Sequence, residues 1–537
     1  MALQFIFGNP GSGKSHYLYE HIIRESMKHP DINYIILVPE QFTMQTQKEL
    51  VLRHPRHGIM NIDVLSFARL AFRVLEETGN GSREILDDEG KNLILRRLAG
   101  KKEDSLKVLK GNIKKPGYIS EVKSVISELT QYNISPDGMD DMITEADESS
   151  YLAWKLKDIQ VMYQAFEEYL ADKYITKEEI LDILCNVMDK SRMLKDSVIA
   201  LDGFTGFTPL QNKVLGEMLH HCQKVMITVT MDKREDPYVM KDKYQLFALS
   251  KQMVTSLVKI AGEEKVLVEE PVCLYQEPVW RFRNAPALAF LEKELFRYSG
   301  RTYREKQSNV RVYAAANPRM EVECAAQRIR FLIRKKEYRY REIAVITGNL
   351  ETYSREILRQ FEKNQIPCFI DYKKNILSNP MVELIRAALE VLQSGFSYES
   401  VFRFLKTGLV MPLAGLSPEV IYQAENYVIA LGIRGFKRWN STWERVYRGA
   451  ELINLDELNQ FREAVVTPFL PLREGFSNRK ATVRERTEAL VHFLEALEME
   501  QKLAAMAQQF EEVGDMSLAK EYGQVYGLVM DLFDRIV

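Results

Sequence analysis

The sequence has 537 residues, of which 46% are hydrophobic and 28% are charged, and its formal net charge is −2 at pH 7. This length excludes a single ordinary domain and predicts roughly three or four, while the composition is that of a globular protein with several apolar cores. The near-zero charge excludes a global basic field that would hold nucleic acid, so such contacts would have to come from local basic patches.

The cysteines and the apolar runs indicate a cytosolic protein. The five cysteines are scattered and form no C-x-x-C pair, so the sequence predicts neither a zinc nor an iron–sulfur site in these residues. No apolar run reaches the length of about 18 residues that a membrane span needs, and the N-terminus has no basic segment with a cleavage site. We therefore expect a cytoplasmic protein that is not embedded in a membrane.

A glycine-rich loop follows the first predicted strand. Residues 3–7 form a short apolar run that predicts a buried strand, and Leu18, Ile22 and Ile23 share one face of a predicted helix after the loop. The sequence between them matches the phosphate-binding pattern G-x-x-x-x-G-K-[ST]. The matching residues are Gly8, Asn9, Pro10, Gly11, Ser12, Gly13, Lys14 and Ser15.

Strand, loop and helix stand in the order that phosphate binding requires. Glycines allow backbone N–H groups to turn toward phosphate oxygens, and the helix N-terminus adds a partial positive charge. In this pattern Lys14 reaches the β- and γ-phosphates, and the Ser15 hydroxyl binds Mg²⁺. We therefore expect ATP and Mg²⁺ as cofactors; the alternative is a glycine-rich turn that carries a lysine by chance.

Further apolar runs predict strands of the same parallel sheet. Residues 34–38, 198–201 and 225–230 are nearly continuous runs of apolar side chains, which is typical of strands buried on both faces. The first run is followed by the largely polar residues 39–47, which we expect to face a ligand crevice at the carboxyl end of the sheet. Residues 62–74 predict the end of another strand that runs into a helix.

Between these strands the pattern is helical. From residue 87 to residue 197 apolar side chains recur at helical spacing, and β-branched runs of strand length are missing. We interpret residues 87–197 as an all-helical insertion. Residues 1–86 and 198–280 would then form a first α/β domain that contains the phosphate-binding loop.

A second, partial α/β domain is predicted over residues 281–395. Asn317 and Pro318 predict the start of a helix in it. Residues 396–537 are predicted to form a helical domain, and because the last helix ends on apolar side chains we expect it to continue beyond this sequence. The predicted strands of the second domain are residues 310–315, 343–346 and 368–370.

Asp202 is the second candidate metal ligand. In a phosphate-loop ATPase an aspartate at a strand end holds Mg²⁺ and a nearby acid activates the attacking water; otherwise Asp202 would be a helix cap or turn residue. Active enzymes of this kind carry a glutamate at the next position, where this sequence has Gly203. Because such proton transfer is typically worth about 10²–10⁴-fold in rate, we expect slow or absent ATP hydrolysis.

Two groups of basic residues are further candidates. Arg281 and Arg283 lie where an arginine could reach the γ-phosphate, and we assign Arg283 to the nucleotide site; a solvated interdomain arginine is the alternative. A basic cluster with interleaved aromatic side chains could track a single DNA strand, although a solvated helix face accounts for it at least as well. The cluster comprises Arg328, Arg330, Arg334, Lys335, Lys336, Arg339 and Arg341 with Phe331, Tyr338 and Tyr340.

Several stretches of the sequence resemble the B subunits of AddAB-type ATP-dependent helicase/deoxyribonucleases. The most specific ones are Pro-Glu-Gln-Phe-Thr at residues 39–43 and Asp-Gly-Phe-Thr-Gly-Phe-Thr-Pro at residues 202–209, whereas the phosphate-binding loop alone is unspecific. The resemblance spans nearly the whole chain. It is also carried by residues 64–70, 343–346, 366–371 and 405–409.

The resemblance implies a UvrD-like helicase architecture, in which two RecA-like phosphate-loop parallel-sheet units carry large all-helical insertions. It implies a degenerate motor that pairs as a heterodimer with an A subunit, which carries the working motor. The complex would bind single-stranded DNA and duplex ends and process double-strand ends for recombinational repair. A nuclease domain with an iron–sulfur cluster is implied only for a C-terminal region absent from this sequence.

Other functions stay open at this point. An autonomous phosphate-loop NTPase or kinase unrelated to DNA repair would carry the same loop, although a small-molecule kinase is usually one compact domain. A non-catalytic scaffold that nucleotide merely stabilises is a third possibility. Active helicases also place a glutamine-containing adenine contact before the loop, but only seven residues precede Gly8 here, so that contact has to come from elsewhere or be lost.

Overall fold

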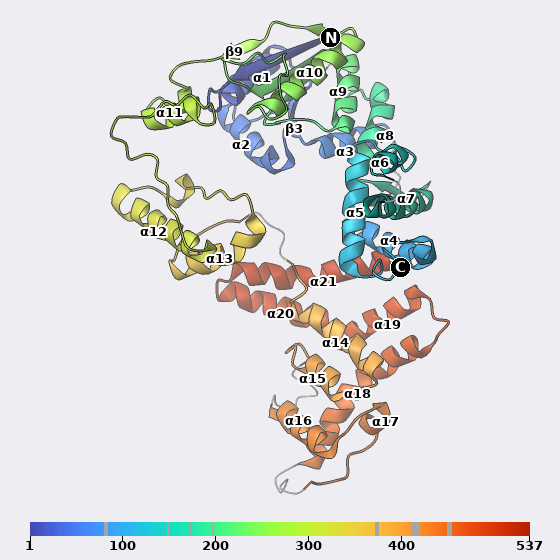
Figure 1. The fold of residues 1–537 in the computed structure, drawn as a ribbon. Helices are drawn as coiled ribbons and strands as arrows, with labels where there is room; N and C mark the ends of the chain where they lie inside the picture. Colours follow the sequence, from blue (N-terminus) through green and yellow to red (C-terminus); the bar gives the residue numbers. More distant parts are fainter. Residues whose placement is uncertain are drawn as a thin grey trace. The chain divides into compact units, whose positions relative to one another are not determined.

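The computed structural model (Figure 1) describes the chain except residues 80–83, 148–149, 172–173, 196, 371–374, 411–418 and 448–453. The chain divides into two compact units, Met1–Tyr313 and Ala314–Val537, and each is described by itself. Among the described residues, no helix is long and apolar enough to cross a membrane.

The first unit is built on a parallel sheet with the strand order β3-β2-β6-β7-β1-β8, in which β9 also pairs with β1. In its register Leu37 lies opposite Leu201, and Leu201 lies opposite Ile227, so that β2, β6 and β7 align near their carboxyl ends. The parallel sheet expected from the apolar runs is therefore confirmed. Its strands are β1 (Ala2–Gly8), β2 (Tyr34–Leu37), β3 (Ile62–Leu65), β6 (Val198–Leu201), β7 (Lys224–Thr230), β8 (Leu267–Val268) and β9 (Val272–Leu274).

Helices cover both faces of this sheet (Figure 1). Alternate side chains of β1 serve the two cores, because Phe5 and Phe7 belong to one apolar cluster and Ile6 to the other. Burying each such side chain stabilises the fold by about 1.5–3 kcal/mol. One face carries α1 (Lys14–Lys28) and α2 (Thr43–Arg53); the other carries α3 (Phe67–Glu77), α8 (Ile180–Val187), α9 (Pro209–His221) and α10 (Ala248–Glu263).

The insertion between β3 and β6 has a separate apolar core and is not entirely helical. Within the predicted all-helical insertion, residues 87–197, the structure has a short strand, β5 (Tyr174–Thr176), which forms a parallel ladder with β4 (Glu84–Leu86) just before the insertion. Strands of three residues are too short to produce a recognisable alternation of side chains. The main helices of the insertion are α4 (Asp88–Lys102), α5 (Pro116–Gln131), α6 (Met139–Glu145) and α7 (Tyr151–Leu170).

The beginning of the second unit consists of α12 (Pro318–Lys336) and α13 (Leu350–Lys363), which share a small apolar core. The three segments predicted as strands from residue 310 to residue 370 are not strands in the described part of the chain. Their apolar side chains stay uncovered: Val312 is 93% exposed, Ile346 93% and Phe369 89%. Strands of a parallel sheet need hydrogen-bonded neighbours and covered faces; these segments have no paired strand among the described residues, and only side chains such as Ile343 and Ile370 pack against the core of α12 and α13.

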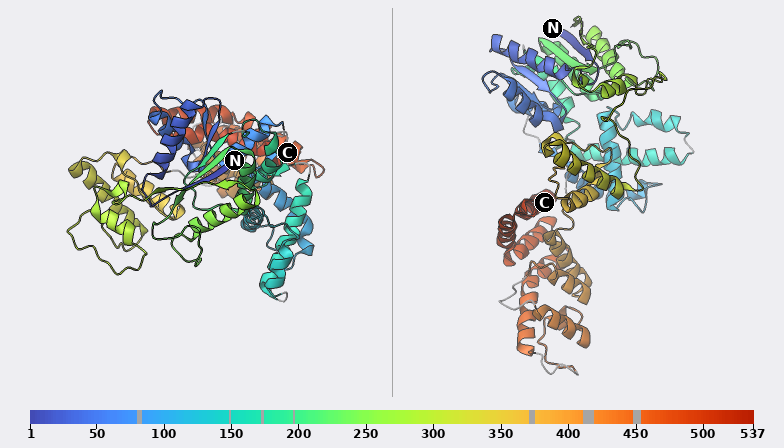
Figure 2. Two further views of the ribbon diagram at one scale, coloured as in Figure 1. Left: turned by 90° about the horizontal axis from the view of Figure 1, so that it is seen from above. Right: turned by 90° about the vertical axis from the view of Figure 1, so that its left-hand side faces the viewer.

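The rest of the second unit is a helical assembly (Figure 2), and its core contains many aromatic side chains. The rings of Phe404, Phe469 and Phe493 contact one another, with the Phe469 centroid 5.0 Å from Phe404 and 4.9 Å from Phe493, and Phe396 packs edge-on against Phe469. The regular elements of its described residues are all helices. The helices are α14 (Pro380–Ser394), α15 (Tyr398–Leu405), α16 (Glu419–Leu431), α17 (Phe436–Trp439), α18 (Leu455–Ser477), α19 (Val483–Ala496), α20 (Met499–Glu512) and α21 (Met516–Ile536).

Candidate nucleotide-binding site

The glycine-rich loop joins the carboxyl end of β1 to the N-terminus of α1, as the sequence predicts. The residue that precedes α1, Gly13, has a φ of 95°, a left-handed conformation that glycine adopts without steric cost. No side chain caps this helix end. Its first backbone N–H groups therefore point out of the helix without a side-chain partner, as in an anion-binding helix terminus.

The Lys14 side chain folds back over this loop. Its Nζ donates hydrogen bonds to the carbonyl oxygens of Gly8 at 3.0 Å and Asn9 at 2.9 Å. Burial lowers the pKa of the Lys14 ammonium to about 8, although the Asp202 carboxylate opposes this shift. The Ser12 hydroxyl is buried and has no hydrogen-bond partner among the described residues. A cation and an unpartnered buried hydroxyl in one loop fit a bound phosphate.

Asp202 follows β6 and lies against the first turns of α1. Its Oδ1 accepts hydrogen bonds from Ser15 Oγ at 3.1 Å and from Thr228 Oγ1 at 2.6 Å, and its Oδ2 accepts one from the Tyr19 hydroxyl at 2.7 Å. Ser15 and Asp202, separated by 187 residues, thus meet directly. Hard oxygen donors of this kind suit Mg²⁺, which is commonly bound through a carboxylate together with substrate phosphates.

Sequence reasoning missed Tyr19 and Thr228. Burial raises the pKa of the Tyr19 hydroxyl above its ordinary value, and the nearby Asp202 carboxylate adds to this, so the hydroxyl stays protonated and donates. Thr228 reaches Asp202 because the register that sets Leu201 opposite Ile227 brings the two following residues side by side. Neither contact has a local signal in the sequence, since each depends on how separate elements pack.

Gly203 occupies the position after Asp202 with a φ of +81°. A Cβ atom there would lie 3.6 Å from Cδ of Pro39, so space is available, but the left-handed backbone disfavours any other residue. The turn after β6 is thus shaped for glycine.

These residues open into a pocket of about 700 Å³. It extends from the phosphate-binding loop and Asp202 to α2, and Trp280 and Arg281 close one side. The Arg281 N–H donates to the Gly11 carbonyl at 3.2 Å. Arg283, which the sequence suggests for the γ-phosphate, does not line this pocket; its guanidinium stacks on the Trp280 ring, 4.1 Å from the centroid. The structure therefore brings Arg281, and not Arg283, to the loop.

Comparison with known proteins agrees with this geometry. The sequence model of the family described as ADDB, N-terminal, matches residues 5–292. The chain belongs to the AddB N-terminal family. Over its full length it is 44% identical to a protein of Lachnoclostridium phytofermentans that is named as the B subunit of an ATP-dependent helicase/deoxyribonuclease, and 35% and 34% identical to proteins of that name from Clostridium kluyveri and Acetivibrio thermocellus. It covers 47% of each, so the chain spans about half the length of these relatives.

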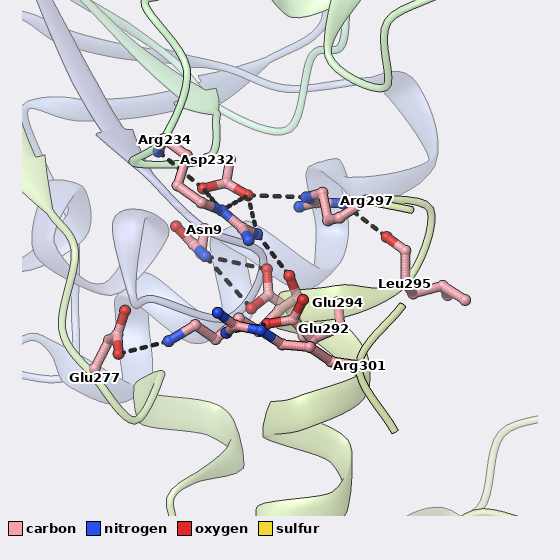
Figure 3. A network of polar contacts seen from close by, with 10 residues as sticks. Asn9, Asp232, Arg234, Glu277, Glu292, Glu294, Leu295, Arg297 and Arg301 are labelled. Atoms are coloured by element: carbon pink, nitrogen blue, oxygen red, sulfur yellow. Dashed lines mark hydrogen bonds and ion pairs between the residues drawn. The ribbon is translucent and has the colours of Figure 1, made fainter. Parts of the chain in front are cut away.

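A polar network flanks the loop of this AddB-family chain (Figure 3). The Asn9 amide donates to both carboxylate oxygens of Glu292 in α11 (Pro286–Glu294), at 3.2 and 3.3 Å. Beside it, Arg234 and Arg297 donate to the buried carboxylate of Asp232. Burial alone would raise the pKa of Asp232, but these hydrogen bonds outweigh burial and lower it to about 2. The network ties the segment after β9 to the loop.

The structure leaves the basic cluster of α12 on exposed and half-buried surface. Arg328 lies over the Phe331 ring with 4.8 Å between its guanidinium carbon and the centroid, and Arg339 pairs with Glu342 at 2.7 Å. Tyr338 and Tyr340 are exposed. Among the described residues no three His, Cys, Asp or Glu side chains gather in a group that could hold a metal ion.

Proposed function

We propose that this chain is the ATP- and DNA-binding N-terminal part of the B subunit of a heterodimeric helicase/nuclease that processes DNA double-strand ends for recombinational repair. The observation that carries the proposal is the meeting of Ser15 and Asp202 at the mouth of a phosphate-binding loop, in a chain of the AddB family. The relatives are named as B subunits of ATP-dependent helicase/deoxyribonucleases, and these names supply the class of reaction.

In this proposal the loop and Lys14 hold the phosphates of ATP, and Ser15 and Asp202 hold Mg²⁺. A bound Mg²⁺ would neutralise phosphate charge. The side chains of Tyr19 and Thr228 keep Asp202 in place, and Arg281 borders the phosphate end, where the sequence suggested Arg283. Because Gly203 offers no carboxylate, we propose that ATP is bound and hydrolysed slowly, so that the motor of this subunit is degenerate.

The domain boundaries belong to the same proposal. Residues 1–86 and 198–280 would be a first RecA-like domain, residues 87–197 its insertion, residues 281–395 part of a second RecA-like domain, and residues 396–537 a helical domain. The small apolar core that α12 and α13 share supports a folded region inside the proposed second domain.

The partners follow from the family. An A subunit would carry the working motor, and DNA, single-stranded or as duplex ends, would be the substrate of a cytoplasmic complex. The relatives contain about as many residues again as this chain covers. We assign any nuclease activity, and any iron–sulfur cluster, to the part of such proteins that this sequence does not cover.

Co-purification with an AddA-type partner and binding of single-stranded DNA test this proposal. We expect this chain, extended to the length of its relatives, to co-purify with an AddA-type partner and to bind single-stranded DNA in a salt-dependent manner. The proposal would be contradicted by a monomeric chain that does not bind DNA and that transfers the phosphate of ATP to a small-molecule acceptor.

A further inference from the structure

The end of the nucleotide pocket at α2 carries a second set of charged side chains. Glu49 and Arg53, one turn apart on α2, line the same pocket as Lys14 and Ser15. His16, the residue after Ser15, also lines it. Figure 1 shows α1 and α2 next to each other on the sheet, and the apolar core beneath them joins Leu18 to Leu50.

Arg53 links the two helices at this end. Its Nε and one terminal nitrogen donate to Glu49 Oε1 at 3.0 and 2.6 Å. Its other terminal nitrogen contacts His16 Nδ1 on α1 and lies 3.6 Å from a carboxylate oxygen of Glu20. The Arg53 side chain is 27% exposed, whereas that of Glu49 is 39% exposed and accessible from the pocket.

An ordinary glutamate–arginine pair on one helix would contribute only about 0.3–0.5 kcal/mol to stability and would face solvent. This pair instead turns toward the pocket, and Arg53 reaches across to the first turn of a different helix. Arg53 forms ion pairs with two carboxylates here, those of Glu20 and Glu49. The local excess of negative charge disfavours a phosphate and suits the uncharged, hydroxyl-bearing part of a nucleotide.

The short distance along α1 from Ser15 to His16 agrees with a sugar-binding role for this end of the pocket. Each residue of an α-helix adds about 1.5 Å along the axis. His16 therefore lies close to Ser15, the proposed Mg²⁺ ligand. In the proposed ATP site, the sugar of the nucleotide would follow the phosphates past this point. A carboxylate held rigid by an arginine is well suited to accept the hydrogens of ribose hydroxyl groups.

Resting on the proposed ATP site, we propose that Glu49 and Arg53 form its ribose subsite. Glu49 accepts hydrogen bonds from the ribose hydroxyl groups, and Arg53 is a positioning residue that fixes Glu49 and His16. The site therefore selects ribonucleotides over 2′-deoxyribonucleotides.

Calorimetric titration of the 537-residue chain with Mg²⁺ and three ligands tests the subsite: ATP, 2′-deoxyATP and inorganic tripolyphosphate. We expect the wild type to bind ATP about tenfold more tightly than 2′-deoxyATP, the size of one charge-assisted hydrogen bond. In Glu49→Gln this ratio should fall toward one through weaker ATP binding, with tripolyphosphate affinity unchanged. Lys48→Ala, an exposed residue of α2 outside the pocket, is the matched control and should keep the wild-type ratio.

The failures of the two proposals are distinguishable. Firm ATP binding by the wild type with no preference over 2′-deoxyATP would overturn the ribose subsite and leave the ATP site standing. Equal losses of ATP and tripolyphosphate affinity in Glu49→Gln would also overturn it, because the substitution would then have disturbed the whole pocket. A wild-type chain that binds none of the three ligands would overturn the proposed ATP site and the subsite together.

Discussion

The Tyr19 hydroxyl donates a 2.7 Å hydrogen bond to Asp202 Oδ2, so an aromatic side chain of α1 holds the carboxylate that Ser15 contacts on its other oxygen. Tyr19 is 4% exposed. Groups that orient a metal ligand typically change metal affinity by about 10–100-fold when they are removed. The position of Asp202 is therefore set by α1 and β7 as well as by its own strand.

Replacing this hydroxyl tests its role. In Tyr19→Phe we expect the Mg²⁺-dependent part of ATP binding to weaken by about tenfold or more, because Asp202 loses a donor, while binding without Mg²⁺ changes little. Titration of ATP with and without Mg²⁺ measures both. Tyr17→Phe removes a hydroxyl from the same helix outside the pocket and is the control. Equal Mg²⁺ dependence in Tyr19→Phe and wild type would contradict the assignment.

Gly203 offers a test of the left-handed turn that follows β6. Because its φ is +81°, we expect Gly203→Ala to lower the free energy of unfolding by about 1 kcal/mol. Gly206→Ala, in the same loop with no positive φ and no atom within 4 Å of an added Cβ, should cost less. Urea unfolding monitored by hydrogen exchange of β6 peptides compares the two variants. If they are equally stable, the left-handed turn is not constrained.

The Asp232 network predicts a pH-dependent contribution to stability. The pKa of Asp232 is lowered to about 2, against about 3.9 for an unfolded aspartate. Its contribution, on the order of 2 kcal/mol, is therefore present above pH about 4 and lost as the pH falls toward 2. We expect Asp232→Asn to destabilise the first unit at pH 7 and to differ little from wild type near pH 2.

Hydrogen exchange of peptides from β7 and from residues 290–300 follows that difference across pH. Asp236→Asn removes the same charge from an exposed position nearby and should have a small effect at every pH. A destabilisation by Asp232→Asn that stays constant between pH 7 and pH 2 would show that the ionised carboxylate is not its source.

The sequence predicted those parts of the fold that depend on residues close together in the chain, namely the strands of the first sheet and the phosphate-binding loop. The sheet of the first unit was visible because its strands are short apolar runs, and the loop because Gly8, Gly13 and Lys14 stand at fixed spacing. The meeting of Ser15 and Asp202 follows from one further rule, that parallel strands end at one edge of a sheet. These features need no knowledge of how distant helices pack.

The remaining features depend on packing between elements. Tyr19 and Arg53 look like ordinary helix residues in the sequence, and only the closeness of α1, α2 and β6 gives them partners. The three-residue strands β4 and β5 leave no periodicity to detect. In the second unit an apolar run such as residues 343–346 predicts a strand, but local sequence does not reveal whether a neighbouring strand is present to pair with it.

The proposed function depends on a site that binds ATP and hydrolyses it slowly. The most direct test is to record ATP binding and phosphate release together for wild type, Lys14→Ala and the control Lys28→Ala, with Mg²⁺ and with or without single-stranded DNA. We predict that Lys14→Ala weakens ATP binding by at least about tenfold, and that DNA does not stimulate release by the wild type. Rapid, DNA-stimulated phosphate release would show that another residue replaces the missing glutamate, and the proposal of a degenerate motor would be wrong.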